Sequence, residues 1–244
     1  MKSSQEPISQ TYPTSFFQVF AEAFKFFRMN YLKILQLALI YMLIGVPGSY
    51  YFEGTLGMKT DEWGLMTPEM GQIGKLLLPL GFIVFAGGMI ILLITFFLLQ
   101  KTENQKLKVL EIYHKAFKHL FHFLIIMILI GISFIGGSIL LIIPGLIFLT
   151  WFIFAPLAYI IEGKTGYQAL EDSRLKVKGH FVSVVLTLIM MLLIFIIPNA
   201  TTAMISEALK LPLFFEQLMF NGINALIIFP FNISVLYQKY RSLN

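Results

Sequence analysis

The feature that constrains this chain most is a stretch of 43 residues, 119–161, that contains no Asp, Glu, Lys or Arg. A helix needs about 20 residues to cross the roughly 30 Å hydrocarbon core of a bilayer, so this stretch is long enough to cross twice. Pro144 and Gly145 lie near its middle. Because proline removes a backbone donor and glycine permits a reversal of the chain, the stretch predicts a helical hairpin that turns at these two residues.

The composition also favours a membrane protein. Apolar residues make up 57% of the chain and charged residues 13%, whereas soluble domains carry about 25% charged residues. The absence of cysteine excludes disulfides, thiolate metal sites and cysteine nucleophiles. Residues 1–14 are polar and lack the apolar core of a signal peptide, so we expect a disordered cytoplasmic tail there.

The remaining residues, 15–244, predict a single domain of the all-α class, a polytopic bundle of transmembrane helices. Apolar runs indicate about six spans, at residues 32–52, 76–99, 121–143, 145–161, 180–198 and 218–237. The first span is expected to end at Pro47 and Gly48. Ser133 and Gly137 form a pair of small residues one turn apart, with Gly136 beside it, which favours close helix packing.

Short amphipathic helices are predicted before three of the spans, at residues 15–30, 108–120 and 167–179. In the first of them, helical spacing predicts an apolar face made of Phe16, Phe20, Ala23, Phe24 and Phe27. A small residue recurs at the same place in each helix, and the triplet Ala-Phe-Lys occurs at 23–25 and again at 116–118, with Ala-Leu at 169–170. This recurrence predicts an internal repeat, although an amphipathic helix before an apolar one is common in any membrane protein.

The basic residues give an orientation. Both termini, residues 101–118 and residues 162–179 together hold 15 of the 18 Lys and Arg side chains. The positive-inside rule therefore predicts that both termini are cytoplasmic. The net charge of +5 follows from this topology, so no nucleic-acid partner is expected. We expect instead that the basic side contacts anionic headgroups.

Candidate catalytic and metal-binding patterns are weak. Gly163-Lys164-Thr165 resembles the end of a phosphate-binding loop, but position 158 is Ala158 where that loop needs glycine. His114 lies about 140° around the helix from His119, so the histidines at 114, 119 and 122 do not predict a metal site. No cofactor, no metal and no enzymatic activity are predicted.

Glu162 is the most informative charged residue, because it follows the uncharged stretch directly. At the inner edge of a membrane an ionisable group usually has a partner, and Arg174, Lys176 and Lys178 are close enough in sequence to provide one. A structural ion pair, a solvated charge and a functional group all remain open. No charged residue falls near the middle of a predicted span, and we expect the asparagines at 221, 224 and 232 to form interhelical hydrogen bonds.

The sequence IIPGLIFLTWFIFAPLAYIIEGKTGYQALEDSRLKVKGHF resembles the pattern of the YciC family of bacterial inner-membrane proteins. The related membrane domain attached to some glycerophosphodiester phosphodiesterases is similar too. Matching positions are Pro144, Gly145, Pro156, Glu162, Gly166, Ala169, Ser173 and Leu175. The resemblance implies a six-span protein of the bacterial cytoplasmic membrane without an assigned activity. No catalytic residue carries over, because the catalytic carboxylates of the phosphodiesterases belong to a separate soluble domain.

Three functions are considered. The first is a component without catalysis that organises lipid, a membrane-protein partner or a second copy of the chain; the second is a transporter of a small solute or lipid. The third, a membrane enzyme, needs carboxylates such as Glu53, Asp61 and Glu62 to converge. The candidate structural motif comprises Pro144, Gly145, Pro156, Glu162, Gly163, Gly166, Ala169, Ser173, Arg174 and Gly179.

Overall fold

The structure is a computed structural model that describes residues 15–55, 58–60, 66–68, 72–102, 108–140 and 142–243. Within these ranges it describes the backbone alone at 40, 44–86, 140, 142 and 213. The predicted tail at 1–14 and the carboxylates of the acidic loop, Asp61 and Glu62 among them, lie outside the described residues.

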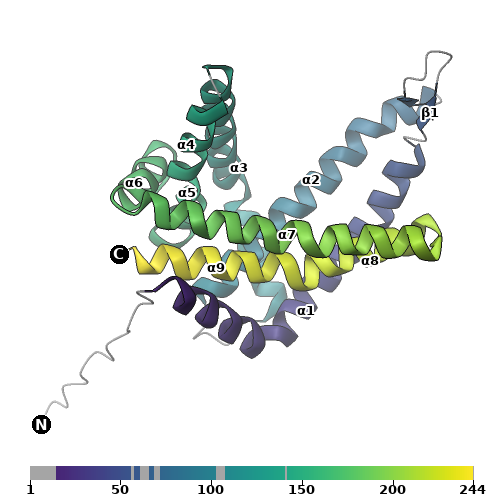
Figure 1. The fold of residues 1–244 in the computed structure, drawn as a ribbon. Coiled ribbons are helices and arrows are strands. Elements are labelled where there is room, and N and C mark those ends of the chain that lie inside the picture. The colour runs from purple at the N-terminus through teal and green to yellow at the C-terminus, as the bar shows by residue number, and fades with distance from the viewer. Residues whose placement is uncertain are drawn as a thin grey trace, which may run out of the picture.

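The described chain is helical apart from two strands of three residues, in the order α1 Phe16–Thr55, β1 Met58–Thr60, β2 Met66–Pro68, α2 Gln72–Lys101, α3 Val109–Leu140, α4 Ile142–Phe152, α5 Ala155–Glu162, α6 Tyr167–Val177, α7 Phe181–Leu209, α8 Leu213–Ile223, η1 Asn224–Ile228 and α9 Phe229–Ser242 (Figure 1). The two strands are antiparallel, with Lys59 opposite Thr67. The element η1 is a π-helix, in which hydrogen bonds join residues five apart instead of four, and it precedes Pro230.

Four stretches among the described residues are long and apolar enough to cross a membrane: Val109–Ile139, Ile143–Glu162, Phe181–Leu209 and Phe214–Ser242. The 29 residues of α7 extend about 43 Å, more than a bilayer core. A further apolar helix, Gly87–Lys101, is shorter. An all-helical architecture with several such stretches indicates a membrane protein, because lipid offers no partner for unpaired backbone groups.

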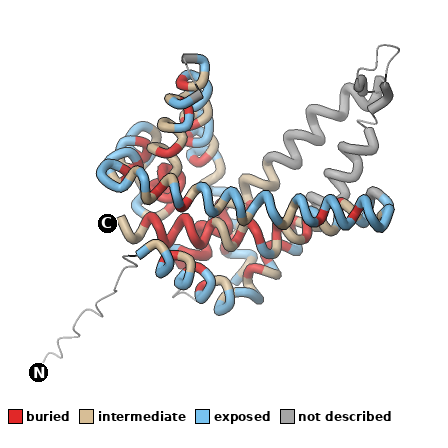
Figure 2. The backbone as a smooth tube through the Cα atoms, in the orientation of Figure 1, coloured by how far each residue is buried: buried red, intermediate tan, exposed pale blue. Residues whose placement is uncertain are grey.

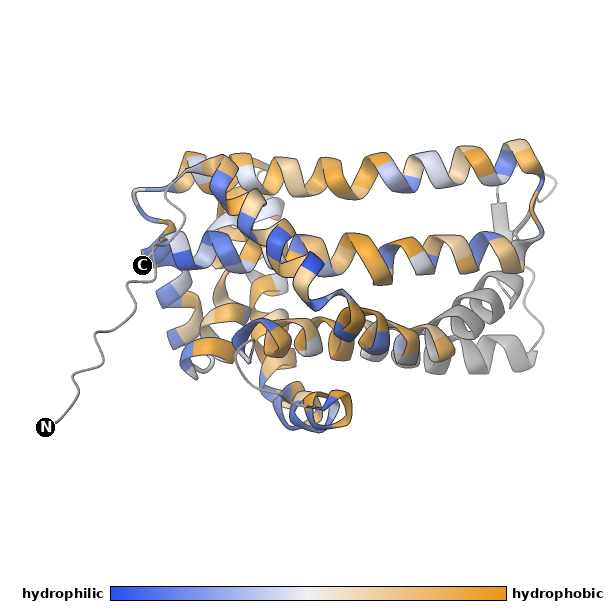
Figure 3. Ribbon diagram, turned by 90° about the horizontal axis from the view of Figure 1, so that it is seen from below, coloured by the Kyte–Doolittle hydropathy of each residue, from blue (hydrophilic) through white to orange (hydrophobic). Residues whose placement is uncertain are grey.

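The core lies around α9, which Figure 2 shows as buried or half-buried along its length, whereas the neighbouring α7 is largely exposed. Every residue of α9 from Ile233 to Tyr240 is buried, including Lys239 at 6% exposure. The exposed positions of α7 are mostly large and apolar, such as Leu186 and Ile189, and Figure 3 shows the hydrophobic colour along most of its length. Apolar side chains are expected on a surface that faces lipid rather than water.

The predicted boundary between a surface helix and the first span is absent, because α1 is a single helix of 40 residues that continues through Pro47 and Gly48. Nothing between residues 30 and 33 interrupts the helix, and the side chain of Asn30 donates back to the carbonyl of Phe26. The predicted apolar face is correct except at Phe24: Ala23 is buried, and Phe16, Phe20 and Phe27 are half-buried. Val19 and Phe26 are also buried, whereas Phe24 is 57% exposed, because the stripe of the helix that packs against α9 excludes Phe24.

The second helix of the predicted hairpin begins earlier than expected, because α4 begins at Ile142 and Pro144 lies in its first turn. Proline is tolerated there, since first-turn N–H groups have no partner within the helix. The two helices lie side by side (Figure 1). A Cβ atom on Gly137 would lie 2.9 Å from the Cα of Gly145, whereas one on Gly136 would meet nothing within 4 Å. Gly137, and not Gly136, therefore permits the close contact.

The fifth predicted span is longer than expected, because α7 continues through Pro198 to Leu209. The asparagines behave differently from one another. Asn224 donates to Asn199 across 2.7 Å and Asn232 donates to the carbonyl of Met191 across 3.3 Å, so both join the last helical segment to α7. Asn221 donates to the backbone carbonyl and to the side-chain oxygen of Gln217 within α8.

Candidate functional site: the α5–α6 junction and the adjoining groove

The candidate site begins at a break in the apolar stretch Ile143–Glu162, where α4 ends at Phe152 and α5 begins at Ala155. Pro156 lies in the first turn of α5, where its missing N–H is not needed. The hydroxyl of Ser173 on α6 donates to the carbonyl of Trp151 across 2.6 Å and accepts the N–H of Phe154 across 3.1 Å. Ser173 is fully buried, so one side chain satisfies two backbone groups that the break exposes.

Glycines set the path from α5 into α6 and from α6 into α7. Gly163 adopts φ +73° at the end of α5, and its N–H donates to the carbonyl of Tyr159 across 3.0 Å. Gly179 adopts φ +91° between α6 and α7. Gly166, which precedes α6, also has a positive φ. L-residues with a side chain rarely adopt this conformation, so these positions favour glycine. The reversal at Gly163 folds α6 back onto α4 and α5.

Two carboxylates and two ammonium groups meet at this junction. The Nζ of Lys164 lies 2.7 Å from Oε2 of Glu162 and also pairs with Asp172. The Nζ of Lys176 lies 3.3 Å from Oε1 of Glu162 and 3.9 Å from Oδ2 of Asp172. The hydroxyl of Tyr240 on α9 donates to Glu162 and lies 3.4 Å from Asp172. We call these five residues the charged junction.

The charged junction is internally balanced, with two positive and two negative groups. Hydrogen bonds to Asp172 and Glu162 raise the pKa of the Lys164 ammonium above its ordinary value, because both carboxylates favour its charged form. The ammonium of Lys176 also lies 4.7 Å from the centre of the Tyr240 ring. The two ammonium groups therefore neutralise the charge of the two carboxylates within the junction. This geometry fastens α5, α6 and α9 together.

The sequence indicated part of this arrangement. Lys176 was predicted as one possible partner of Glu162, and the structure shows this ion pair. Arg174, another candidate, lies 4.8 Å from the centre of the Trp151 ring instead. The contribution of Tyr240 was missed, since 78 residues separate it from Glu162 and no local pattern relates them. The spacing of Asp172 and Lys176, four residues apart on one helix, is a signal that could have been used.

Other motif residues lie near the junction or away from it. Ala169 is completely buried, as are Ala23 and Ala116 at the corresponding positions of the predicted repeat. Pro144 and Gly145 lie at the opposite end of α4 and take no part in the junction.

Two lysines, the exposed Lys101 and the buried Lys239, donate to groups at helix ends beside the junction. The ammonium of Lys101 at the end of α2 donates to the carbonyl of Ile160 across 2.6 Å. The ammonium of Lys239 donates to the hydroxyl of Ser183 across 2.7 Å. The ends of α2, α5 and α9 and the beginning of α7 therefore meet in one region. All of these residues belong to the side that the sequence predicts to be cytoplasmic.

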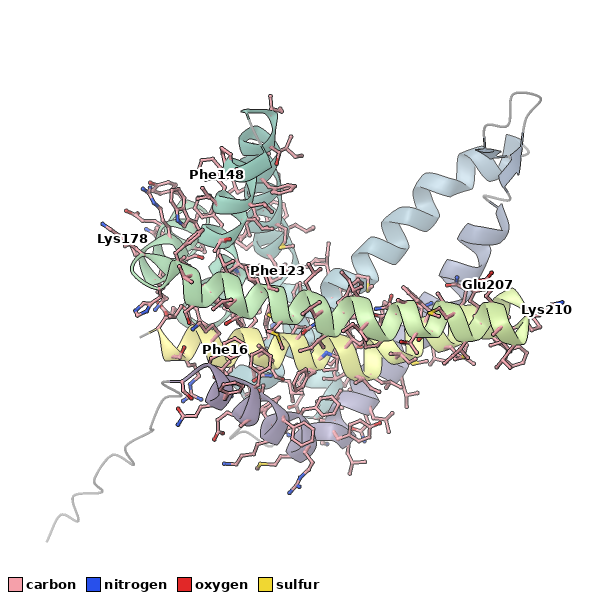
Figure 4. All side chains as sticks on the ribbon, viewed as in Figure 1. Phe16, Phe123, Phe148, Lys178, Glu207 and Lys210 are labelled. Carbon is pink, nitrogen blue, oxygen red and sulfur yellow. The ribbon has the colours of Figure 1, made fainter. Side chains whose placement is uncertain are left out.

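A groove of about 720 Å³ lies on the other side of α6, between α3, α4, α6 and the beginning of α7. Its lining is mainly apolar and includes Leu129, Ile147 and Phe181. Charged residues of the lining belong to α6 and the residue after it: Glu171, Arg174 and Lys178. Figure 4 shows Lys178 at the end of the molecule opposite Glu207 and Lys210.

The histidines contribute aromatic contacts. Nδ1 of His119 lies 2.8 Å from the hydroxyl of Tyr159, and the ring of His122 stacks on Tyr159 with the centroids 6.0 Å apart. In the part of the chain that the structure describes, no three His, Cys, Asp or Glu side chains gather closely enough to hold a metal ion.

Comparisons with family models, with curated proteins and with solved structures find no match to this chain.

Proposed function

We propose that this chain is a six-span protein of the bacterial cytoplasmic membrane, with both termini cytoplasmic, that organises lipid or a membrane partner without catalysing a reaction. Its basic cytoplasmic side would attract anionic headgroups, at about 1 kcal/mol for each Lys or Arg near the surface. The sequence pattern that resembles the YciC family implies this location and topology, and it implies no specific reaction.

One observation carries the proposal: the carboxylates of the charged junction form ion pairs within the protein, whereas the nearby basic groups of Arg174 and Lys178 line a groove. Glu162 and Asp172 are each paired with Lys164 and Lys176. An acid–base catalyst needs a carboxylate that can reach a substrate. Carboxylates held by two ammonium groups are better suited to fastening helices together. A rigid junction with outward basic groups favours binding over catalysis.

The transporter alternative is less well supported by the described grooves. A path for a polar solute calls for polar groups near the middle of the bilayer. The larger groove is mainly apolar, and a second one of about 250 Å³ is lined by apolar residues of α2, α3 and α9. Asn199 and Asn224, which could have lined a polar path, are hydrogen-bonded to each other.

The absence of cysteine makes the topology directly testable. Single cysteines introduced by Lys178→Cys and Lys210→Cys provide one site on each predicted side of the membrane. In intact bacteria, a membrane-impermeant thiol reagent should label the variant at 210 and leave the variant at 178 unlabelled until the cells are opened. Labelling of position 178 in intact cells would contradict the orientation.

The binding role is tested with purified wild-type protein in vesicles. Native mass spectrometry should find anionic phospholipid or a partner protein retained after extraction from bacterial membranes. Vesicles containing the protein should show no greater solute leakage than empty ones. Retention of neither lipid nor partner, or a saturable solute flux, would contradict the proposed function.

A further inference from the structure

The groove beside α6 combines two properties that a lipid site requires. Its volume of about 720 Å³ falls within the range of pockets that hold small molecules. Its deep part is apolar, with Leu129 on α3 and Ile147 on α4, while the charged side chains belong to the α6 side. The groove is therefore amphipathic along its length. An amphiphile with one apolar chain and one charged group would place its chain in the apolar part of the groove and its charge beside α6.

The charge at the rim favours an anion. Arg174 and Lys178 lie one helical turn apart, and Glu171 adds the single carboxylate of the lining. Within the described part of the chain, neither basic side chain has a carboxylate within ion-pairing distance. Lys164 and Lys176 differ in this respect, because each forms ion pairs with carboxylates of the charged junction. Two basic groups against one acidic group leave a net positive rim.

The side chain of Arg174 is held in place without losing its hydrogen-bonding capacity. Its guanidinium lies 4.8 Å from the centre of the Trp151 ring, which also lines the groove. A cation–π contact restricts the position of the guanidinium and leaves its N–H groups free to donate. Arginine in such a position is suited to bidentate contact with a phosphate. Tryptophan at the same level is typical of the membrane interface.

The depth of the groove fits an acyl chain. Ser133, one of its lining residues, lies 15 residues beyond Lys118 along α3. At 1.5 Å per residue this is about 22 Å from the last basic residue of that helix, well into the hydrocarbon region. The groove thus extends from the level of charged side chains to the level of lipid tails.

We infer that this groove binds one anionic phospholipid of the inner leaflet, with its phosphate between Arg174 and Lys178 and one acyl chain running past Trp151 toward Ser133. The inference rests on the proposed function for its orientation, which places α6 at the cytoplasmic surface. Basic recesses between transmembrane helices on that surface are suited to anionic headgroups. The site gives the proposed lipid-organising role a specific position and a specific lipid charge.

The test uses the full-length protein in vesicles of phosphatidylethanolamine and phosphatidylglycerol, followed by native mass spectrometry. The variant Arg174→Gln with Lys178→Gln removes both rim charges. The control Arg28→Gln with Lys115→Gln removes two equally charged, exposed residues of α1 and α3. We expect the first variant to retain phosphatidylglycerol about tenfold less than wild type, and the control to retain it nearly unchanged.

A second pair of variants tests the chain-binding part. Ser133→Trp fills the deep end of the groove, whereas Ile132→Trp changes an adjacent residue that is 62% exposed. We expect Ser133→Trp to displace the lipid and Ile132→Trp to leave it bound. If Ser133→Trp does not fold, the rim variants, which alter exposed residues, decide the question alone.

The outcomes separate this inference from the proposed function. Lipid retained by wild type but lost equally in both charge variants, or phosphatidylethanolamine bound as tightly as phosphatidylglycerol, would overturn the groove site and leave the proposed function intact. A dimer that Ser133→Trp abolishes would overturn it in favour of a second copy of the chain. Wild-type protein that retains neither lipid nor partner would overturn both.

Discussion

The two sides of α6 use the same kinds of side chain for different purposes. On one side Asp172 and Lys176, one turn apart, pair with Lys164 and Glu162 beside α5, and both contact Tyr240 of α9. On the other side Arg174 and Lys178 face the groove. The difference lies in what surrounds each pair. A charge that meets opposite charges contributes to the fold, whereas one without such partners can recognise a ligand.

The largest expected effect comes from Ser173, which holds α6 in the position that separates the two sides. Ser173→Ala would leave the carbonyl of Trp151 and the N–H of Phe154 buried without partners, at about 1–3 kcal/mol for each group. The midpoint of thermal unfolding in detergent should fall markedly. Ser133→Ala is the matched control, because that hydroxyl only donates to a carbonyl of its own helix. Equal shifts in the two variants would refute the bridging role.

A smaller effect is expected from breaking the junction itself. Glu162→Gln and Tyr240→Phe each remove part of the contact between α5 and α9, so a double-mutant cycle should show coupling of about 0.5–3 kcal/mol. The cycle of Glu162→Gln with Arg174→Gln is the comparison, since Arg174 contacts Trp151 instead. Its two effects should add. Coupling of Glu162 with Arg174 but not with Tyr240 would mean that Arg174, and not Tyr240, contacts Glu162.

Alkaline pH should weaken the charged junction through the ammonium of Lys164. Folding raises the pKa of Lys164, so its stabilisation is complete below the unfolded value of about 10.4 and is lost as pH rises through the folded value. The unfolding temperature of wild type should therefore fall more steeply above about pH 10.4 than that of Lys164→Gln. Parallel curves for the two proteins would show that the ammonium of Lys164 adds nothing to stability.

The smallest effect on stability is expected from the groove side. Arg174→Gln should lower the unfolding free energy by no more than about 1 kcal/mol through its contact with Trp151. Lys178→Gln should change it by less than about 0.5 kcal/mol, as for most surface substitutions. Denaturation of both variants in lipid-free detergent measures this. A loss as large as that of Ser173→Ala would mean that these basic groups belong to the fold rather than to a binding site.

Helical content could be predicted wherever a long apolar run exists, because burial in lipid demands a helix whatever its neighbours are. Helix boundaries could not be predicted as well. Pro47 and Pro198 were expected to mark span ends and lie inside helices, while Pro144 was expected in a turn and lies in a first helical turn. A proline weakens a helix locally, and the surrounding packing decides whether the chain stops there.

The candidate site was recognised as a set of residues but not as an arrangement. Glycines at 163, 166 and 179 were identified, and their positive φ angles explain why those positions favour glycine. Glu162 was recognised as a group in need of a partner. That Ser173 bridges a helix break and that Arg174 lies on Trp151 depends on contacts 19 to 23 residues apart in sequence, which no periodic pattern encodes.

The sequence by itself determined a helical chain with long apolar segments, because the hydrophobicity of each residue acts directly against lipid and water. Only the tertiary structure decided which charges cancel. Lys176 and Lys178 are two residues apart on the same short segment, yet one meets Glu162 and the other borders the groove. Helical geometry places them about 200° apart around the axis, and the elements packed on each side give the same ammonium group its different surroundings.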